Sequence, residues 1–426
     1  MANLSGLSST SSLAEWLLWQ ENNHPKEIDL GLERVASVYK QLAISENSRP
    51  YTITVAGTNG KGSSVALLES ILLAAGYKVG VYSTPHLLQY NERIRVNATM
   101  VSDAQLSSSF ADIDSARESI SLSYFEYGTL AALDIFSKLH VDVQILEVGL
   151  GGRLDAVNII DADAVLITSI DIDHIDWLGN DRATIALEKA GVFRPAQKAV
   201  CGDKAVPETL LNYANELKTD LLCAGIDYDL SFDTKQWTLK SEHCFSGTYQ
   251  HPALKGDHQI QNAAAVVSLL GHIKQVLPVT KENIDLGLSK VFLAGRLQLI
   301  PGQPQVLLDV AHNPESARAL ASFLDNYEDS ITIRAVFSIL EDKDLGNVLK
   351  PFLKRVKKWY IAPLDASRAK LVSQISTKIK LDDTQQCFEA PTIKAAFLSA
   401  KSQSAPADLI ICFGSFYVVE ACLGAL

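Results

Sequence analysis

A cluster of glycines, one lysine and hydroxyl side chains lies at residues 55–64, where the sequence reads VAGTNGKGSS. It follows the apolar, β-prone run 51–55 and opens the apolar run 65–73, which predicts strand, glycine-rich turn and helix. Glycines let backbone N–H groups approach an anion, and the start of a helix attracts negative charge. Lys61 would reach the outer phosphates of a nucleotide, and Ser63 would offer a hydroxyl to Mg²⁺.

This loop departs from the usual phosphate-binding pattern G-x-x-x-x-G-K-[ST]. Two residues rather than four separate Gly57 from the Gly60-Lys61 pair, and Gly62 stands between Lys61 and Ser63. The alternative is a tight turn that uses glycine for geometry alone. Such a turn does not require a lysine between two glycines followed by two hydroxyls, so phosphate binding is favoured.

Polar side chains follow three further predicted strands. Strand 79–82 leads into STPHLL at 83–88, and strand 141–146 leads to Glu147. Strand 164–168 leads to 171–179, where His174 is expected to end a strand parallel to the one that ends in Glu147. Ligands of open α/β folds bind at the carboxyl edge of a parallel sheet, so these positions suit a ligand site. Glu147 stands where a nucleotide enzyme would hold Mg²⁺. For His174, a structural role and a role as ligand or acid/base group are equally open.

Three other features stay open on the residues alone. The aromatic cluster 124–127 precedes a predicted helix over 129–139, and it suits either the core or stacking on a flat ligand. Lys189 lies on a predicted helix, where a lysine is usually solvated. Asp29 is expected to cap the helix that follows it.

Length and composition indicate a two-domain globular protein. The chain has 426 residues, of which 47% are hydrophobic and 20% charged. We expect a domain boundary near 293–297, a small antiparallel sheet within 221–250, and later strands at 305–310, 331–337, 359–362 and 409–413. No apolar run is long enough to span a bilayer, and the first residues do not look like a secretory signal.

Net charge and cysteine spacing indicate which classes of binding partner and which redox compartment to expect. The net charge of −11 argues against nucleic acid as a main partner. The densest basic run, 354–358, is short and is expected to be the solvated end of a helix. The six cysteines form no C-x-x-C pair, so we expect free thiols in a reducing cytosol.

Several motifs occur in one order along nearly the whole chain, and together they are far more specific than any one alone. The motifs are GTNGKGS at 57–63, STPHL at 83–87, EVGLGGRLDA at 147–156, Asp173-His174, EKAG at 188–191, Gly295-Arg296, DVAHNP at 309–314 and GSF at 414–416. In this order they resemble the folylpolyglutamate synthase family, within the ATP-dependent Mur-type ligases.

The resemblance implies a fold and an activity. The fold would be a P-loop Mur-ligase-type ATPase domain with a small antiparallel accessory sheet over 1–295, and a smaller Rossmann-like α/β domain over 296–426. The activity would be ATP-dependent ligation of L-glutamate to dihydropteroate and to the glutamate tail of reduced folates, through an acyl phosphate. The enzyme would be a cytoplasmic monomer with two Mg²⁺ sites, and a monovalent cation such as K⁺ would be an optional further cofactor.

Alternatives remain at this point. The nearest is a folylpolyglutamate synthase without dihydropteroate activity, which the segment 28–32 disfavours because bifunctional members use it for dihydropteroate. A cell-wall Mur ligase acting on a UDP-sugar peptide is a second alternative. A nucleotide-binding switch without ligase activity is a third, and the intact set Lys61, Glu147, His174 and Asp309 speaks against it.

The resemblance also implies roles for individual residues. Two positions depart from the family pattern: Thr84 replaces a serine, and Tyr417 stands where relatives often have histidine. The implied metal ligands are Ser63, Thr84, Glu147, His174 and Lys189, the last as a carbamate. The implied ATP-binding residues are Thr58, Asn59, Gly60, Lys61, Gly62, Ser63, Asn262, Arg296 and Asp309. The implied catalytic residues are Lys61, Lys189, His174, Asp155 and His312. The implied substrate-binding residues are Asp29, Leu30, Gly31, Leu32, Ser83, Thr84, Pro85, His86, Ser123, Phe125, Leu154, Asp155, Ala156 and Ser415.

Overall fold

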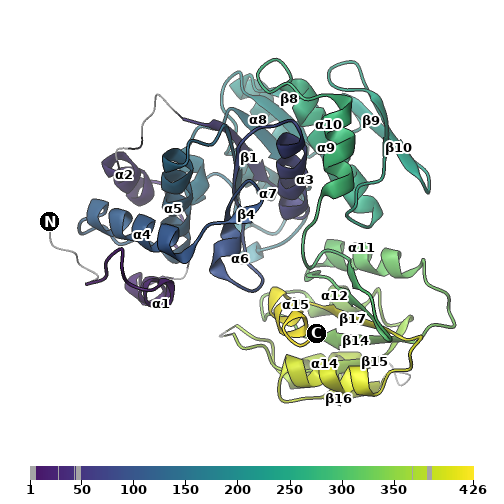
Figure 1. Ribbon diagram of the computed structural model, residues 1–426. Helices are drawn as coiled ribbons and strands as arrows, with labels where there is room; N and C mark the ends of the chain where they lie inside the picture. Colours follow the sequence, from purple (N-terminus) through teal and green to yellow (C-terminus); the bar gives the residue numbers. More distant parts are fainter. Residues whose placement is uncertain (1–5, 27, 43, 45–48, 367, 381–385) are drawn as a thin grey trace. The chain divides into compact units, whose positions relative to one another are not determined.

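The structure is a computed structural model that describes residues 6–426, except 27, 43, 45–48, 367 and 381–385. The chain forms two compact units (Figure 1). The first unit comprises Met1–Ala253 and Ile260–Val291, and the second comprises Leu254–Gln259 and Phe292–Leu426.

The first unit is built around an eight-stranded sheet with the order β4-β3-β2-β5-β1-β6-β7-β8. The six strands from β2 to β8 in this order are parallel, and β3 and β4 form an antiparallel edge. β1 is buried at every residue but its first, as expected for a central parallel strand. The strands are β1 Tyr51–Ala56, β2 Val79–Tyr82, β3 Ile94–Val96, β4 Thr99–Met100, β5 Val143–Glu147, β6 Ala164–Ile167, β7 Lys198–Cys201 and β8 Asp220–Cys223.

Helices cover this sheet. α3 contacts β1, β2 and β5 and packs against α10, while α5 contacts β2 and packs against α4 and α1. Figure 1 shows α1, α2, α4 and α5 gathered in one group and α3, α9 and α10 in another. The helices are α1 Leu13–Asn23, α2 Glu33–Gln41, α3 Lys61–Ala74, α4 Asp103–Ala116, α5 Tyr124–Lys138, α6 Ile175–Leu178, α7 Arg182–Ala190, α8 Glu208–Leu217, α9 Asp257–His272 and α10 Lys281–Lys290.

A small antiparallel sheet of three strands lies within the first unit and confirms the predicted accessory sheet. Its strands are β9 Tyr228–Phe232, β10 Gln236–Ser241 and β11 Gly247–Gln250. Trp237 on β10 and Tyr249 on β11 are buried and stack with ring centroids 4.7 Å apart. The stacked pair lies on the buried face of the sheet, whereas the residues next to them along each strand are exposed or half-buried.

The second unit has a six-stranded sheet with the order β12-β13-β17-β14-β15-β16. Only β12 is antiparallel to its neighbour. Its core includes Phe337, Trp359 and Phe413 from three neighbouring strands. The elements are β12 Gln298–Ile300, β13 Gln305–Leu308, α11 Pro314–Leu324, β14 Ile333–Phe337, α12 Leu345–Leu349, β15 Val356–Ile361, α13 Val372–Ile379, β16 Gln386–Glu389, α14 Ile393–Ser402, β17 Leu409–Phe413 and α15 Phe416–Leu423.

Some local predictions were wrong. α5 begins at Tyr124 rather than at 129, because Ser123 and Glu126 form a capping box. The residue at the start of α2 is Leu32, and the Asp29 side chain takes part in ion pairs instead of capping. The basic run 354–358 leads into β15 and is not the end of a helix.

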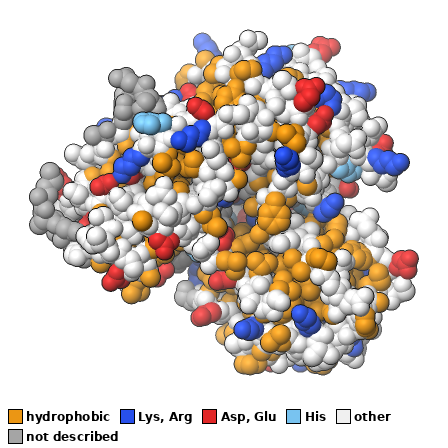
Figure 2. All heavy atoms as spheres, viewed as in Figure 1, with side chains coloured by type: hydrophobic (Ala, Val, Ile, Leu, Met, Phe, Trp, Pro, Cys, Tyr) orange, Lys and Arg blue, Asp and Glu red, His pale blue; other side chains and the backbone are white. Residues whose placement is uncertain are grey.

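Two surface features complete the description. Among the described residues, no helix combines the length and apolar character that crossing a membrane requires. On the face drawn in Figure 2, the described Lys and Arg side chains are scattered among acidic and apolar ones and do not gather into a basic stripe.

Candidate active site

The candidate site lies at the carboxyl edge of four neighbouring strands of the first unit. β2, β5, β1 and β6 are adjacent and parallel, with Tyr82 opposite Leu146 and Val55 opposite Glu147. The loop after β1 carries the glycine-rich motif, the loop after β2 carries Thr84, and β5 ends at Glu147. The loop after β6 leads to His174, so one sheet edge brings all of these loops together.

The glycine-rich loop adopts the predicted strand–turn–helix form. α3 begins at Lys61, with Gly60 at its N-cap in the left-handed conformation, and Ser63 lies buried in its first turn. The Lys61 ammonium donates to the carbonyl oxygens of Gly57 (2.9 Å) and Thr58 (3.0 Å). Lys61 is therefore folded over its own loop, on the side where phosphate oxygens would replace those carbonyls as its partners.

Two glycines of the loop are required by close neighbours. A Cβ on Gly57, whose φ is 146°, would lie 1.9 Å from the Thr168 hydroxyl oxygen. A Cβ on Gly60, whose φ is 85°, would lie 2.5 Å from the Oδ1 of Asn262. The first contact ties the loop to β6. The second places Asn262, on α9, directly against the loop.

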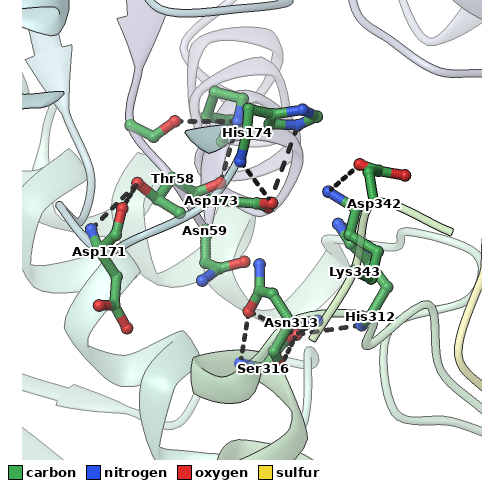
Figure 3. Close-up of polar contacts among 12 residues, drawn as sticks. Thr58, Asn59, Asp171, Asp173, His174, His312, Asn313, Ser316, Asp342 and Lys343 are labelled. Atoms are coloured by element: carbon green, nitrogen blue, oxygen red, sulfur yellow. Dashed lines mark hydrogen bonds and ion pairs between the residues drawn. The ribbon is translucent and has the colours of Figure 1, made fainter. Parts of the chain in front are cut away.

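Thr58 and Asn59 are held by the segment after β6. The Thr58 hydroxyl donates to the carbonyl oxygen of Asp171 and accepts from its backbone N–H, both at 3.0 Å (Figure 3). The backbone N–H of Thr58 donates to the carbonyl of Ser169 at 2.7 Å. The Asn59 carbonyl accepts from the Thr168 hydroxyl at 2.6 Å. These bonds hold the loop against the segment after β6.

Glu147 and Thr84 lie next to each other. The backbone N–H of Thr84 donates to Oε2 of Glu147 at 3.3 Å, and Glu147 is buried. The Thr84 hydroxyl accepts from Nη1 of Arg93 at 3.2 Å, and Nε of Arg93 donates to Nδ1 of His86 at 2.8 Å. Burial, and then the positive charge of Arg93, lower the pKa of His86 to about 4. Ser83, beside them, accepts from Arg95 at 3.1 Å, and Pro85 is exposed.

His174 precedes α6 in a left-handed conformation, with φ of 51°. Its backbone N–H donates to Oδ1 of Asp173 at 2.8 Å, and its Nε2 lies 4.0 Å from the other carboxylate oxygen (Figure 3). The side chain of His174 is 39% exposed, so the ring is accessible to a ligand. His174 does not end a strand, as the sequence suggested, because β6 stops at Ile167.

Lys189 is the most unusual titratable group of the site. It lies on α7 and is only 3% exposed, contrary to the expectation for a helix lysine. Burial, and then the nearby charge of Lys61, lower the pKa of Lys189 to about 7, while the Asp173 carboxylate acts in the opposite direction. An amine with this pKa is partly neutral at physiological pH and can act as a nucleophile.

Asp155 organises the turn after β5. Its carboxylate accepts from the backbone N–H groups of Gly149, Leu150 and Val157 at 2.9, 2.9 and 3.0 Å. Burial raises its pKa to about 6, although these donors and Lys61 oppose the rise. Ala156 follows in a 3-10 turn, Ala156–Ile159, and Leu154 is exposed.

Some of the substrate-binding residues that the resemblance implies adjoin one another. The backbone N–H of Gly31 donates to the carbonyl of Leu154 at 3.3 Å, so the segments 29–32 and 154–156 adjoin. Phe125 packs close to Gly149, where an added Cβ would lie 2.9 Å from its ring. Leu30 and Leu32 are half-buried beside Gly31.

Arg34 joins the segment around Asp29 to the start of α5. Its Nη1 lies 3.0 Å from Oδ2 of Asp29, and its Nη2 lies 3.0 Å from Oε1 of Glu126. Oε2 of Glu126 accepts from the backbone N–H of Ser123 at 2.7 Å. Oδ2 of Asp29 also lies 3.1 Å from Nε2 of His24.

In the second unit, Asp309 and His312 follow β13 and Ser415 follows β17, and these two strands are adjacent and parallel. Arg296 lies before β12. Asp309 is buried and accepts from the backbone N–H groups of Leu297 and Ala311, both at 2.8 Å. Burial raises its pKa, while those donors and Arg296 oppose the rise. Arg296 lies over the ring of Phe416 at 5.2 Å. Ser415 caps α15, in keeping with its place directly before that helix.

His312 lies between the same two strand ends. Its Nδ1 is 2.8 Å from the carbonyl oxygen of Val310, and its ring is 6.2 Å from that of Phe416. Figure 3 shows His312 and Asn313 with Ser316, and the pair Asp342 and Lys343. Lys343 is buried, and its ammonium lies 3.5 Å from Asp342.

Sequence reasoning missed several of these polar groups. Arg93 and Arg34 have no motif of their own, because a single arginine in a polar segment is ordinarily solvated. The Ser123-x-x-Glu126 spacing was a readable capping signal. Lys343 lies in the sequence EDKD at 341–344, in the segment that follows β14, and a polar segment after a parallel strand was the available signal.

The donor set suits a hard divalent cation. Among the described residues there is no group of three or more His, Cys, Asp or Glu side chains that could hold a metal ion. Mg²⁺ does not require one, because it typically takes one or two carboxylates and completes its shell with water and substrate phosphates. Glu147 offers such a carboxylate, and Thr84 is held beside it by the bond from its backbone N–H.

Comparison with known proteins agrees with this geometry. The family model of the Mur ligase middle domain matches residues 55–270, and that of the Mur ligase glutamate ligase domain matches residues 295–416. Fold and site together therefore define an ATP-dependent ligase of the Mur type, with the predicted architecture.

Relatives that match over nearly the whole chain identify the family within this class of ligases. The dihydrofolate synthase/folylpolyglutamate synthase of Escherichia coli (strain K12) is 41% identical over 415 residues, covering 96% of this chain and 94% of the relative. The structure of E. coli FolC in complex with DHPP and ADP has a TM-score of 0.91 at 40% identity, covering 98% of both chains. A bifunctional folylpolyglutamate synthase/dihydrofolate synthase with Mn, AMPPNP and L-glutamate bound has a TM-score of 0.90 at 40% identity and the same coverage. The chain belongs to the dihydrofolate synthase/folylpolyglutamate synthase family.

Proposed function

We propose that this ligase joins L-glutamate to dihydropteroate, giving dihydrofolate, and to the glutamate tail of reduced folates, using ATP for both. One observation carries the proposal: the phosphate loop, Glu147 and the edge residues Thr84 and His174 meet at a single sheet edge. The relatives solved with DHPP and ADP, and with AMPPNP and L-glutamate, support the choice of substrates.

The reaction requires two transfers in one site. A carboxylate oxygen of the pteroate or folate attacks the γ-phosphorus of ATP, and ADP leaves. The amine of L-glutamate then attacks the acyl carbon and loses a proton, and inorganic phosphate leaves with the electron pair of the C–O bond. Positioning and charge neutralisation dominate the rate of such steps.

The glycine-rich loop has the features needed for the phosphates. Gly60, Lys61 and Gly62 lie at the start of α3, where backbone N–H groups attract an anion, and Lys61 adds a positive charge. Thr58 and Asn59 precede them, with their own backbone N–H groups bonded to Ser169. Asn262, against Gly60, is placed to limit how the nucleotide enters the loop. Arg296 and Asp309 contribute to the nucleotide from the second unit, and His312 and Ser415 to the incoming glutamate.

Glu147, Thr84, His174 and Ser63 would hold a divalent cation. When bound, it would neutralise negative charge on the transferring phosphoryl group. The protein's own part is to keep the Glu147 carboxylate buried and to hold the Thr84 backbone against it. Mn in two related structures supports a divalent metal in this family.

Lys189 would serve this site as a carbamate. Its neutral amine would add to CO₂, so that an N–C bond forms and the nitrogen loses a proton to solvent. The product is an anion where a buried cation stood, and Lys61 would then attract it rather than repel it. The carbamate would hold a second divalent cation, and a monovalent cation such as K⁺ would be a separate addition.

The remaining assignments complete the proposal. The segments 29–32, 83–86, 123–125 and 154–156 form the pteridine-binding wall, and the contact between Gly31 and Leu154 supports their grouping. We place the functional domain boundary at 295/296. We also propose a monomer that works in the cytoplasm, where ATP and reduced folates are available.

The test is a substrate panel. The protein is incubated with ATP, Mg²⁺ and L-glutamate, together with either dihydropteroate or tetrahydrofolate, and ADP and the glutamylated product are measured. Product from both is expected. If product forms from tetrahydrofolate but not from dihydropteroate, the protein is a folylpolyglutamate synthase without dihydropteroate activity. Turnover of a UDP-sugar peptide would favour a cell-wall Mur ligase. If glutamate causes no release of ADP, a nucleotide-binding switch without ligase activity would be favoured.

A further inference from the structure

Arg93 lies at the centre of the polar contacts on the loop after β2, although it belongs to none of the sequence motifs. It ends the 3-10 turn Tyr90–Arg93 and directly precedes β3, which pairs antiparallel with β2. Its carbonyl oxygen accepts from the backbone N–H of Ser83 at 2.9 Å. Arg93 is therefore held against the segment 83–86 by the backbone, independently of its side chain.

The Arg93 guanidinium contacts four side chains. Nε donates to Nδ1 of His86 at 2.8 Å, and Nη1 donates to the hydroxyl of Thr84 at 3.2 Å. Its central carbon lies 5.3 Å from the ring centroid of Tyr90 and 5.4 Å from that of Tyr124. The two aromatic rings fix the position of the guanidinium by cation–π contacts, and its N–H groups then fix Thr84 and His86.

We propose that Arg93 is a positioning residue that sets the proton on His86 and the orientation of the Thr84 hydroxyl for ligation. A guanidinium N–H can only donate, so Nδ1 of His86 must be an acceptor and carry no proton. The proton of the neutral ring is therefore on Nε2. His86 then presents an N–H donor, which suits the ring nitrogen and carbonyl acceptors of a pteridine. This step rests on the proposed function.

The same contact prepares Thr84 for a cation. A hydroxyl oxygen has two lone pairs, and the bond from Arg93 occupies one of them. The hydroxyl hydrogen must point elsewhere, and the second lone pair remains for a metal ion. Thr84 stands next to Glu147, the acidic ligand of the proposed cation, through the bond from its backbone N–H. Arg93 thus couples the cation side of the loop to the pteridine side.

Lysine cannot replace Arg93 in this role. The contacts to His86 and Thr84 use two nitrogens of one rigid, planar fork, whereas a lysine ammonium has a single nitrogen on a flexible stem. Arg93→Lys keeps the charge and a cation–π partner for Tyr90 and Tyr124. This variant is therefore expected to fold but to lose the simultaneous hydrogen bonds to His86 and Thr84.

The first experiment measures the proton on His86 directly. The full-length protein is labelled with ¹⁵N-histidine, and the His86 signals are assigned by their loss in His86→Gln. Correlation of the ring protons with the ring nitrogens distinguishes a protonated from an unprotonated nitrogen. We expect protonated Nε2 and unprotonated Nδ1 in the wild type at neutral pH, and a mixture of the two tautomers in Arg93→Lys. A proton on Nδ1 in the wild type would overturn the proposal.

The second experiment uses the ligation assay. In Arg93→Lys, we expect the Mg²⁺ concentration for half-maximal rate and the KM for dihydropteroate each to rise about 10- to 100-fold, the usual effect of losing a charge-assisted hydrogen bond. Arg49→Lys is the matched control. Arg49 precedes β1 and therefore lies at the opposite edge of the sheet, where it contacts Asp163 and the carbonyl of Asp161.

A double-mutant cycle with Thr84→Val completes the test, because valine keeps the shape but removes the acceptor. If Arg93 acts through Thr84, Arg93→Lys should add almost nothing to the Mg²⁺ effect of Thr84→Val. Additive effects, or an unchanged Mg²⁺ dependence and KM in Arg93→Lys, would overturn the proposal. Absence of ligation by the wild type would refute the proposed function alone, since the tautomer measurement requires no activity.

Discussion

Replacing Lys189 by methionine should make the protein more stable and inactive. The Lys189 side chain is buried, and the charge of Lys61 lies near it, so its protonated form is held in an unfavourable place. Methionine has a similar length, carries no charge and packs well in irregular apolar spaces. The substitution therefore removes an electrostatic cost while it retains most of the packing.

The size of this cost follows from the pKa. Folding lowers the pKa of Lys189 from 10.5 to about 7, and each pKa unit corresponds to about 1.4 kcal/mol. At a pH below 7, the buried ammonium therefore costs on the order of 5 kcal/mol. Local relaxation would reduce this figure, so we expect Lys189→Met to increase the free energy of unfolding by about 2 to 5 kcal/mol at about pH 6.

The pH dependence gives a second, independent signature. Between pH 7 and 10.5 the unfolded chain keeps a proton on Lys189 that the folded protein has lost. The wild type should therefore gain stability as the pH rises through this window, and the methionine variant should not gain this contribution. The difference between the two proteins should be largest below about pH 7 and shrink towards pH 10.

The assay is urea denaturation in CO₂-free buffer at several pH values, combined with ligation in bicarbonate buffer. Turnover by Lys189→Met should fall about 100-fold or more, because a group that neutralises charge in the transition state is lost. Lys189→Ala should lose turnover to the same extent without the gain in stability, because it leaves a cavity. A methionine variant less stable than the wild type at about pH 6 would refute the burial argument, and near-normal turnover would refute the carbamate.

Three further substitutions test other parts of the site. Gly57→Ala should destabilise the fold by about 2 to 4 kcal/mol in denaturant, because its Cβ would meet the Thr168 hydroxyl at 1.9 Å; an unchanged midpoint would contradict the packing at this loop. Glu147→Gln should raise the Mg²⁺ requirement of ligation at least about 10-fold, and equal Mg²⁺ dependence would exclude it as a ligand. Asp309→Asn should weaken ATP binding in calorimetry and cost about 1 to 3 kcal/mol of stability, since an amide oxygen replaces a carboxylate that accepts two backbone N–H groups. Wild-type ATP affinity in that variant would remove Asp309 from the nucleotide site.

The parts of the site that sequence reasoning recovered depend on local signals. The glycine-rich loop was predicted because an apolar strand, a Gly/Lys/Ser cluster and an apolar helix follow one another within about twenty residues. Glu147 was placed at a strand end by the same kind of pattern. The roles of Asn262 and Asp309 came from the family resemblance, because nothing in their neighbourhoods indicates a nucleotide.

Other properties depend on how elements pack against one another rather than on local sequence patterns. The Lys189 amine is buried because α7 packs in the core of the first unit, and its pKa is lowered further by Lys61, which follows β1. The contacts of Arg93 arise when β3 pairs with β2 and brings it against Thr84 and His86. No spacing in the sequence encodes either environment.

The amino-acid sequence by itself therefore determined the fold class, the phosphate loop and the kind of chemistry, because hydrophobic periodicity and glycine placement act locally. Only the tertiary structure decided which charges lie near one another and which are removed from water. The proximity of Lys61 and the removal from water set the pKa of Lys189, and the pairing of β3 with β2 sets the tautomer of His86. Both depend on how strands and helices pack, which no local pattern in the sequence contains.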